Sequence, residues 1–255
     1  MKIYLKRIAV TMAFIFVACE CSAVESDRAL LEINFSTKVL NRYIGDTGVA
    51  TYNHPISQND LTIIHVPTGF YLDIWQSIST SHSGRSTNYG NEIEYFLGWS
   101  GEIAGIGMDT GIGYFDLITL FAMPGGDVVQ PYVELTKKIN VTDQHAITPY
   151  VRAEYGIPAK GNAKELKGLY VYSGLKHGWQ ISKDFSINQK VSIIFDDGAY
   201  GVDRAWVGAY EISPSYRIIE WLAFDLSGKV IGPFSNTTDG RKTQFIGGAG
   251  FSVNF

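Results

Sequence analysis

The sequence predicts an all-β fold: a transmembrane, antiparallel, up-and-down β-barrel of about twelve strands, each about 9–11 residues long. Three observations support this prediction. Apolar and polar residues alternate with period two in many short segments, and long and short connections alternate between those segments. The chain also starts like an exported protein and ends on an aromatic residue. A soluble β-sandwich or a lipocalin-type barrel explains the first observation but gives no reason for the second.

The N-terminus has the pattern of a secretory signal peptide. Three basic residues occur in the first seven positions, an apolar run covers 8–18, and a small-residue site ends at Ala23. The apolar run is too short to span a bilayer, which takes about 20 apolar residues. We therefore expect residues 1–23 to be removed and residues 24–255 to form one outer-membrane barrel.

An alternative processing route starts at Cys19. The preceding Phe16-Val17-Ala18 resembles a lipoprotein box, although Phe is a poor first residue for it, and Cys19 would then be the lipidated first residue. Cleavage after Ala23 instead removes both Cys19 and Cys21, the two cysteines of the chain. The mature chain would then have no disulfide, no thiol nucleophile and no cysteine metal site.

Period-two alternation places the strands, because successive side chains of a strand point to opposite faces. In one segment Ile93, Tyr95 and Leu97 share a face, with Glu92 and Glu94 on the other. The expected strands are 29–38, 59–66, 70–78, 92–100, 106–114, 128–138, 147–155, 168–178, 185–195, 204–214, 222–227 and 243–255. Their number is even, as a single-chain bacterial barrel with both ends on one side requires.

The last of these strands has the clearest pattern. Its outer face is apolar or small from Phe245 through Phe251 and Val253 to Phe255, while small and polar residues dominate the other face. An apolar face suits lipid and a small, polar face suits water. Phe251, Val253 and the terminal Phe255 also resemble the signal that the bacterial barrel-assembly machinery reads.

The connections provide an independent signal. Those expected to be long are 39–58, 80–90, 116–127, 156–167, 196–203 and 230–242, and short ones lie between them. Outer-membrane barrels have short periplasmic turns and longer extracellular loops, so both chain ends should be periplasmic. Pro67-Thr68-Gly69 and Pro214-Ser215 are predicted turns of the short class.

Composition fits this fold and excludes one class of partner. The chain has 21 basic and 25 acidic residues, and removal of the first 23 residues takes away three and one of these, leaving a formal charge of −6. A nucleic-acid partner would require a basic face, so none is expected. Mean hydropathy is +0.02, as expected when half of each strand faces lipid and half faces water.

Several segments resemble the TorF-like putative porins, a proteobacterial outer-membrane family. The similarity is strongest over about 30–180. It is carried by Gly69-Phe70-Tyr71 with Ile74-Trp75, Glu92-Ile93-Glu94-Tyr95 with Gly98-Trp99-Ser100-Gly101-Glu102, Asp109-x-Gly111 with Tyr114, and the Pro124-Gly125 turn region. The resemblance implies a porin-type barrel and supplies no catalytic motif.

Charged residues on the inner face are the candidates for lining a pore. They are Asp73, Glu92, Glu94, Asp109, Arg152, Glu154, Lys176, Lys190 and Asp225. An excess of carboxylates predicts a modest preference for cations. In the alternative interpretation these charges pair with one another, bulky inward residues such as Trp75 and Tyr150 close the bore, and the long loops, including 39–58, form the working surface.

A barrel enzyme is the third function class. It would need a nucleophile or acid beside a histidine on the outer rim, and Ser81-His82-Ser83 is the best local match. Neighbours on a strand face opposite ways, so adjacent residues seldom form a hydrogen-bonded dyad. We therefore expect no catalytic residue, no cofactor and no metal.

Acidic residues concentrate in or beside the long loops. They are Asp46, Asp127, Asp196, Asp197, Asp203 and Asp239. They could bind the divalent cations that bridge lipopolysaccharide, or they could be ordinary turn residues in water. No calcium-loop spacing is present, which favours the turns.

Tryptophans near strand ends are expected to form the aromatic girdles at the two membrane interfaces. They are Trp99, Trp179, Trp206 and Trp221. The sequence as a whole predicts an outer-membrane, porin-like channel for passive passage of small polar solutes or ions. Its expected partners are outer-membrane lipid, lipopolysaccharide, the assembly machinery during insertion, and the solutes themselves.

Overall fold

The computed structural model describes residues 30–80, 91–116, 127–159 and 167–255. The predicted signal peptide, Cys19, His82 and the Pro124-Gly125 turn lie outside the described residues. The strands are β1 (Leu31–Leu40), β2 (Tyr43–Ile44), β3 (Ala50–Tyr52), β4 (Ile56–His65), β5 (Phe70–Ser79), β6 (Glu92–Ile103), β7 (Ile106–Asp116), β8 (Val128–Thr136), β9 (Ile139–Asn140), β10 (His145–Pro158), β11 (Gly168–Gln180), β12 (Phe185–Asp196), β13 (Ala205–Ile219), β14 (Leu222–Pro233) and β15 (Gln244–Asn254).

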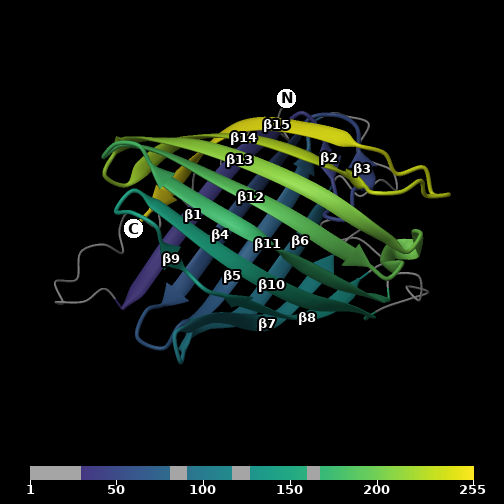
Figure 1. The fold of residues 1–255 in the computed structure, drawn as a ribbon, viewed down its shortest axis with the longest axis horizontal. Helices are drawn as coiled ribbons and strands as arrows, with labels where there is room; N and C mark the ends of the chain where they lie inside the picture. Colours follow the sequence, from purple (N-terminus) through teal and green to yellow (C-terminus); the bar gives the residue numbers. More distant parts are fainter. Residues whose placement is uncertain (1–29, 81–90, 117–126, 160–166) are drawn as a thin grey trace, which may run out of the picture.

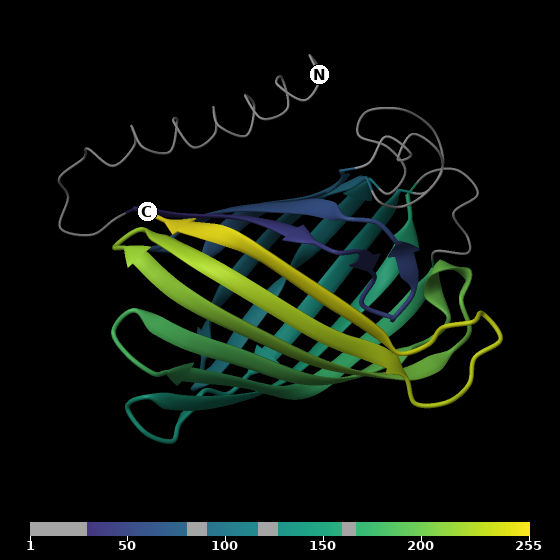
Figure 2. The ribbon, with the colours of Figure 1, turned by 90° about the horizontal axis from the view of Figure 1, so that it is seen from above.

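Twelve antiparallel strands form a closed barrel (Figures 1 and 2). Each strand pairs with its neighbours along the chain, β10 pairs with β11, and β15 pairs back onto β1. Of the remaining strands, β9 adds a short edge to β10, while β2 and β3 form a separate hairpin. The predicted fold class and strand number are confirmed, and each of the twelve barrel strands overlaps a predicted segment.

The connections alternate in length around the barrel, as predicted. Short connections, among them 104–105, 181–184 and 220–221, lie at the end of the barrel where β15 ends. The long connections, including 41–55 and 234–243, lie at the opposite end. We refer to these as the periplasmic and extracellular ends, following the rule for outer-membrane barrels.

The predicted turn at Pro214-Ser215 is wrong. Pro214 lies inside β13, and the connection to β14 is at Glu220-Trp221. Pro214 pairs with Ile187 of β12, but the ladder to β14 is interrupted between Ile212 and Ser215. Proline has no N–H to donate, so this interruption accommodates it within the strand.

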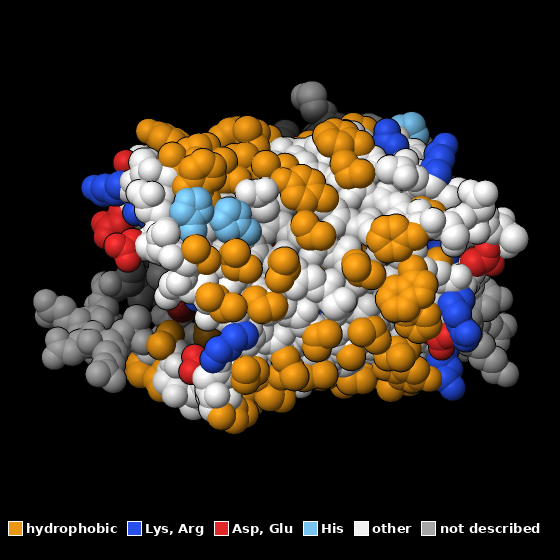
Figure 3. All heavy atoms as spheres, in the orientation of Figure 1, with side chains coloured by type: hydrophobic (Ala, Val, Ile, Leu, Met, Phe, Trp, Pro, Cys, Tyr) orange, Lys and Arg blue, Asp and Glu red, His pale blue; other side chains and the backbone are white. Residues whose placement is uncertain are grey.

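Apolar side chains are exposed over the middle of the outer surface and form an apolar belt, one face of which is seen in Figure 3. Large apolar side chains are exposed all around it, including Leu97 and Phe245 at 62% and 60%. A water-soluble monomer rarely exposes so large an apolar surface, whereas a surface in contact with lipid requires one. Within the described ranges, no helix is long and apolar enough to cross a membrane.

A glycine allows the first and last strands to pair, and we call this β15–β1 contact the seam of the barrel. A Cβ added at Gly250 would lie 1.9 Å from the Thr37 carbonyl oxygen and 2.8 Å from the Lys38 Cα. These are backbone atoms of β1, which cannot move aside as the end of a side chain can. Gly250 therefore permits the close approach of β15 to β1 that closes the sheet.

We predict that Gly250→Ala destabilises the folded barrel by about 1–3 kcal/mol, the range for overpacking a tight contact. The measurement is the unfolding midpoint in urea, followed by the heat-modifiable shift of the folded band on a gel. Gly247→Ala is the matched control, because the nearest atom to its added Cβ is the Phe245 ring edge at 3.5 Å. Equal midpoints for the two variants would contradict the role of the seam.

Candidate functional site

The long connection between β1 and β4 folds into the lumen. It carries the β2–β3 hairpin at the extracellular end (Figure 1), and its residues Ile44, Thr47 and Tyr52 are buried. The alternative interpretation, in which 39–58 forms part of an external interaction surface, is therefore wrong for this connection. The physical reason is that a twelve-stranded barrel encloses more space than its own side chains fill, and the connection occupies it.

Polar contacts hold this inward hairpin to opposite walls. The Tyr43 hydroxyl donates to the Glu92 carboxylate on β6. Asp46 Oδ1 lies 2.9 Å from Lys229 Nζ on β14. Burial, with the negative charge of Glu92 next in importance, raises the pKa of Tyr43 well above its usual value, so the hydroxyl stays a donor.

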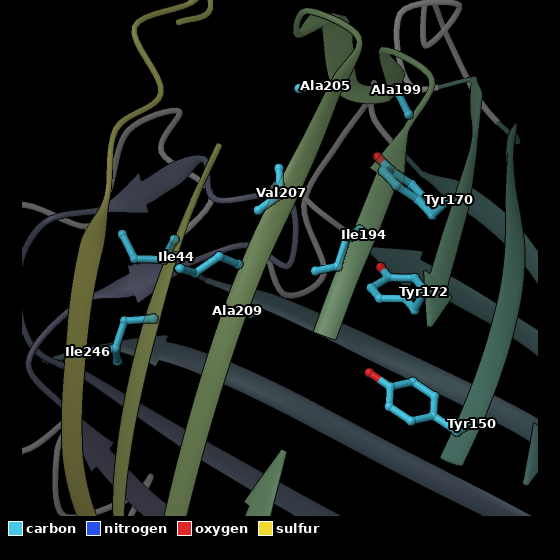
Figure 4. Close-up of a cluster of buried hydrophobic side chains, with 11 residues drawn as sticks. Ile44, Tyr150, Tyr170, Tyr172, Ile194, Ala199, Ala205, Val207, Ala209 and Ile246 are labelled. Atoms are coloured by element: carbon cyan, nitrogen blue, oxygen red, sulfur yellow. The ribbon is translucent and has the colours of Figure 1, made fainter. Parts of the chain in front are cut away.

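An apolar contact supplements these bonds. Ile44 belongs to a buried cluster with Val207, Ile231 and Ile246, which come from β13, β14 and β15. In Figure 4, Ile44 lies beside Ile246 and Val207, while Tyr150, Tyr170 and Tyr172 project from the neighbouring wall. The extracellular half of the lumen therefore has a small hydrophobic core of its own.

Arg241 holds the turn of the β2–β3 hairpin from the extracellular side. It comes from the β14–β15 connection, is 2% exposed, and lies 2.7 Å from the fully buried Asp196 carboxylate. Its guanidinium also donates to the Thr47 carbonyl at 3.2 Å and to the Asp203 carbonyl, and it pairs with Asp239 at 2.8 Å. One side chain thus joins three extracellular connections.

Below the hairpin lies a cavity of about 700 Å³. One side of it carries four carboxylates from three adjacent strands: Asp60 of β4, Asp73 of β5, and Glu92 and Glu94 of β6. Within the described residues none of these four forms an ion pair with a lysine or arginine. Three of the predicted inward residues, Asp73, Glu92 and Glu94, are thus brought together on one side of the cavity.

The other predicted inward charges are mostly paired. Arg152 and Glu154 both line the cavity and lie 2.9 Å apart. Lys176 pairs with Glu134, and Lys190 lies 3.9 Å from Glu211.

Two further predicted acids lie on the same inner face. Asp109 accepts a hydrogen bond from Tyr71 at 2.7 Å. Asp225 shares the inner face of β14 with Ser227 and Lys229 by alternation along the strand. All nine predicted pore-lining residues therefore belong to the inner face, but only five of them line the cavity.

The predicted aromatic residues lie near the two rims. Trp99 donates its indole N–H to the Thr68 carbonyl at 2.8 Å, and Trp179 precedes the β11–β12 turn. Trp221 stacks on Phe255, with ring centroids 5.9 Å apart. Trp206 is 54% exposed near the extracellular end of β13. Phe251 is 45% exposed, whereas Val253, on the same face by alternation, is 8% exposed, and their role as an assembly signal stays a prediction.

The loop acids serve as local structural groups. Asp196 accepts hydrogen bonds from the backbone N–H groups of Gly198 and Ala199, as an ordinary turn carboxylate does. Hydrogen bonds from Thr238 lower the pKa of Asp203 below its usual value. No group of three or more His, Cys, Asp or Glu side chains in the described part of the chain is placed to hold a metal ion.

Sequence reasoning missed the residues that hold the hairpin. Arg241 has no predicted role, and alternation predicts only that Lys229 faces the lumen, not that it holds a connection there. A basic residue in a long connection is ordinarily solvated, and the sequence contains no sign that one connection enters the lumen. The contacts join residues 183 and 194 positions apart.

Comparison with solved structures identifies the fold. The KdgM porin is 12% identical over 88% of this chain and 99% of its own, with a TM-score of 0.51. The NanC porin is 10% identical over 88% and 98%, with a TM-score of 0.50. The COG4313 outer membrane channel from Pseudomonas putida F1 is 10% identical over 92% and 98%, with a TM-score of 0.53.

These similarities show a porin-type barrel, the fold of Gram-negative outer-membrane porins, and nothing narrower. No protein-family model and no curated protein matches the chain. The specific resemblance to the TorF-like family therefore stays a prediction.

We predict that Arg241→Met destabilises the protein by about 3–5 kcal/mol, because it leaves the buried Asp196 charge unpaired. Urea unfolding of the refolded protein measures the loss. The matched control is Arg204→Met, which breaks the exposed pair with Asp197, 69% and 38% exposed, and should cost about 0–1 kcal/mol. If both variants lose a similar free energy of unfolding, burial of the Arg241–Asp196 pair does not determine its contribution to stability.

We also predict that acid releases the hairpin. The Lys229 ammonium lowers the pKa of Asp46 from 3.8 to about 2 against the opposing effect of desolvation. A depressed folded-state pKa means that this contribution is present above pH 3.8 and is lost as the pH falls through about 2. A spin label at the exposed Ala50→Cys should therefore gain mobility between these values.

Asp46→Asn is the control for this measurement. In that variant the label should already be mobile at neutral pH and should respond little to acid. If the label in the protein with Asp46 intact is equally mobile at pH 6 and at pH 2, the Asp46–Lys229 pair does not hold the hairpin.

Proposed function

We propose that this protein is a porin-like channel of the bacterial outer membrane that passes small polar solutes or ions with a modest preference for cations. The barrel fold and its apolar outer belt support the location, since only a closed barrel or a helix satisfies its backbone within lipid. No chemical step is involved, and selectivity comes from the charge and width of the lumen.

The four cavity carboxylates, which we call the acidic wall, account for the proposed cation preference. Asp60, Asp73, Glu92 and Glu94 line the cavity without a basic partner among the described residues. Carboxylate rings attract cations and repel anions. Two of the four basic residues that line the cavity are paired with carboxylates, Lys229 with Asp46 and Arg152 with Glu154. Of the other two, Arg42 donates to Gln244, and neither it nor Lys38 forms an ion pair among the described residues.

The hairpin defines where selection takes place. Tyr43 bonds to Glu92 and also packs near Trp75, with ring centroids 5.9 Å apart. Any solute that crosses the lumen on this side passes these rings and the carboxylates beneath them. We therefore place selection at the hairpin and the four carboxylates Asp60, Asp73, Glu92 and Glu94.

A non-conducting barrel is the second candidate function. The observation in its favour is the buried cluster around Ile44, which fills part of the extracellular end. In that case the remaining extracellular connections would carry the function by contacting a partner. Conductance separates the two candidates directly.

We predict discrete single-channel steps in a planar bilayer and a cation-leaning reversal potential in a salt gradient. Glu92→Gln/Glu94→Gln should lower the cation-to-anion permeability ratio about fivefold, the factor that roughly 1 kcal/mol of Coulomb energy in water represents. Glu102→Gln, on the same strand but outside the cavity lining, is the control and should leave the ratio unchanged. A folded barrel that never conducts would falsify the channel, and an unchanged ratio would remove the acidic wall as its filter.

A further inference from the structure

A row of polar side chains crosses the lipid-facing wall of the barrel. It consists of His145 on β10, His177 on β11, Gln189 on β12 and Tyr210 on β13. Alternation along each strand puts them on the same face as exposed Ile147, Leu175 and Val191. Figure 3 shows two histidine side chains side by side within the apolar surface.

The hydrogen bonds of this row run in one direction. Tyr210 donates to Gln189 Oε1 at 2.8 Å, and Gln189 Nε2 lies 3.2 Å from His177 Nδ1. An amide nitrogen only donates, so His177 Nδ1 accepts and its Nε2 carries the proton. That Nε2 lies 3.1 Å from His145 Nδ1 and donates to it. The remaining proton of a neutral His145 is therefore on its Nε2.

The row ends in two N–H donors without partners. His145 stacks on Trp179, with ring centroids 5.2 Å apart and planes at 22°. Among the described residues, neither His145 Nε2 nor the Trp179 indole nitrogen has a hydrogen-bond acceptor. Trp99, near the same rim, differs because its indole N–H donates to a turn carbonyl at 2.8 Å.

The position of these donors limits what can accept from them. His145 begins β10 and Trp179 precedes the β11–β12 turn, so both lie where the apolar belt meets the periplasmic rim. Exposed aliphatic residues, Ile139, Ile147 and Leu175, surround them. At this depth the surroundings are the glycerol and phosphate region of a lipid, with acyl chains along the wall.

We propose that His145 Nε2–H and the Trp179 indole N–H form a binding site for the phosphate of a glycerophospholipid in the periplasmic leaflet. Two neutral donors without an acceptor are complementary to an anionic oxygen, and bonds to charged acceptors are about twice as strong as neutral ones. The adjacent aliphatic wall accommodates the acyl chains. The chain of bonds back to Tyr210 holds His145 in the tautomer that donates outward.

The test is native mass spectrometry of the refolded protein in a glycoside detergent, titrated with phosphatidylethanolamine. We expect one lipid to bind. His145→Phe/Trp179→Phe should weaken binding at least tenfold, because it removes both N–H donors while leaving an aromatic ring at each position. Trp99→Phe, which removes an indole N–H near the same rim, should bind as the wild type does. The single variants His145→Phe and Trp179→Phe replace the double variant if it does not fold.

Three results would overturn the proposal. Diacylglycerol with the same acyl chains could bind as tightly, which would show that the phosphate is not recognised. The double variant could retain wild-type affinity. A dimer peak that the double variant loses, without any lipid adduct in the wild type, would assign this face to a second copy of the chain. None of these outcomes depends on whether the lumen conducts.

Discussion

The structure depends on one constraint: in lipid, no backbone N–H or C=O of the sheet can be left without a partner. A flat sheet always leaves two edges unpaired, so the sheet must close, and here the closure is the pairing of β15 with β1. The backbone approach at Gly250 is a local consequence of that requirement. The even number of strands follows as well, because a closed sheet in which every pair is antiparallel needs an even number.

Closure creates a second problem, which the inward hairpin addresses. A ring of twelve strands encloses a lumen too wide for side chains alone to fill. The connection after β1 enters it, and charged and apolar contacts hold it there. Asp46 and Tyr43 reach opposite walls, Ile44 packs into a small core, and Arg241 secures the tip. The four carboxylates Asp60, Asp73, Glu92 and Glu94 line the cavity that remains.

The sequence predicted what depends on local alternation and failed where distant segments meet. Period-two patterns located all twelve barrel strands and the inner face of Glu92, Glu94 and Asp73, because both depend only on neighbouring residues. Pro214 was misplaced, since its turn preference yields to the pairing of β12 with β13. The lumenal position of Asp46 and the burial of Arg241 depend on closure of the barrel, which no local pattern encodes.

The hairpin also implies an order of events in assembly. It is made near the start of the chain, yet Lys229 and Arg241, which hold it, belong to the final two strands and the connection between them. It therefore cannot take its place until β14 and β15 have joined the wall. A chain truncated before Lys229 would therefore lose both contacts that hold the hairpin together with the β15–β1 pairing that closes the sheet.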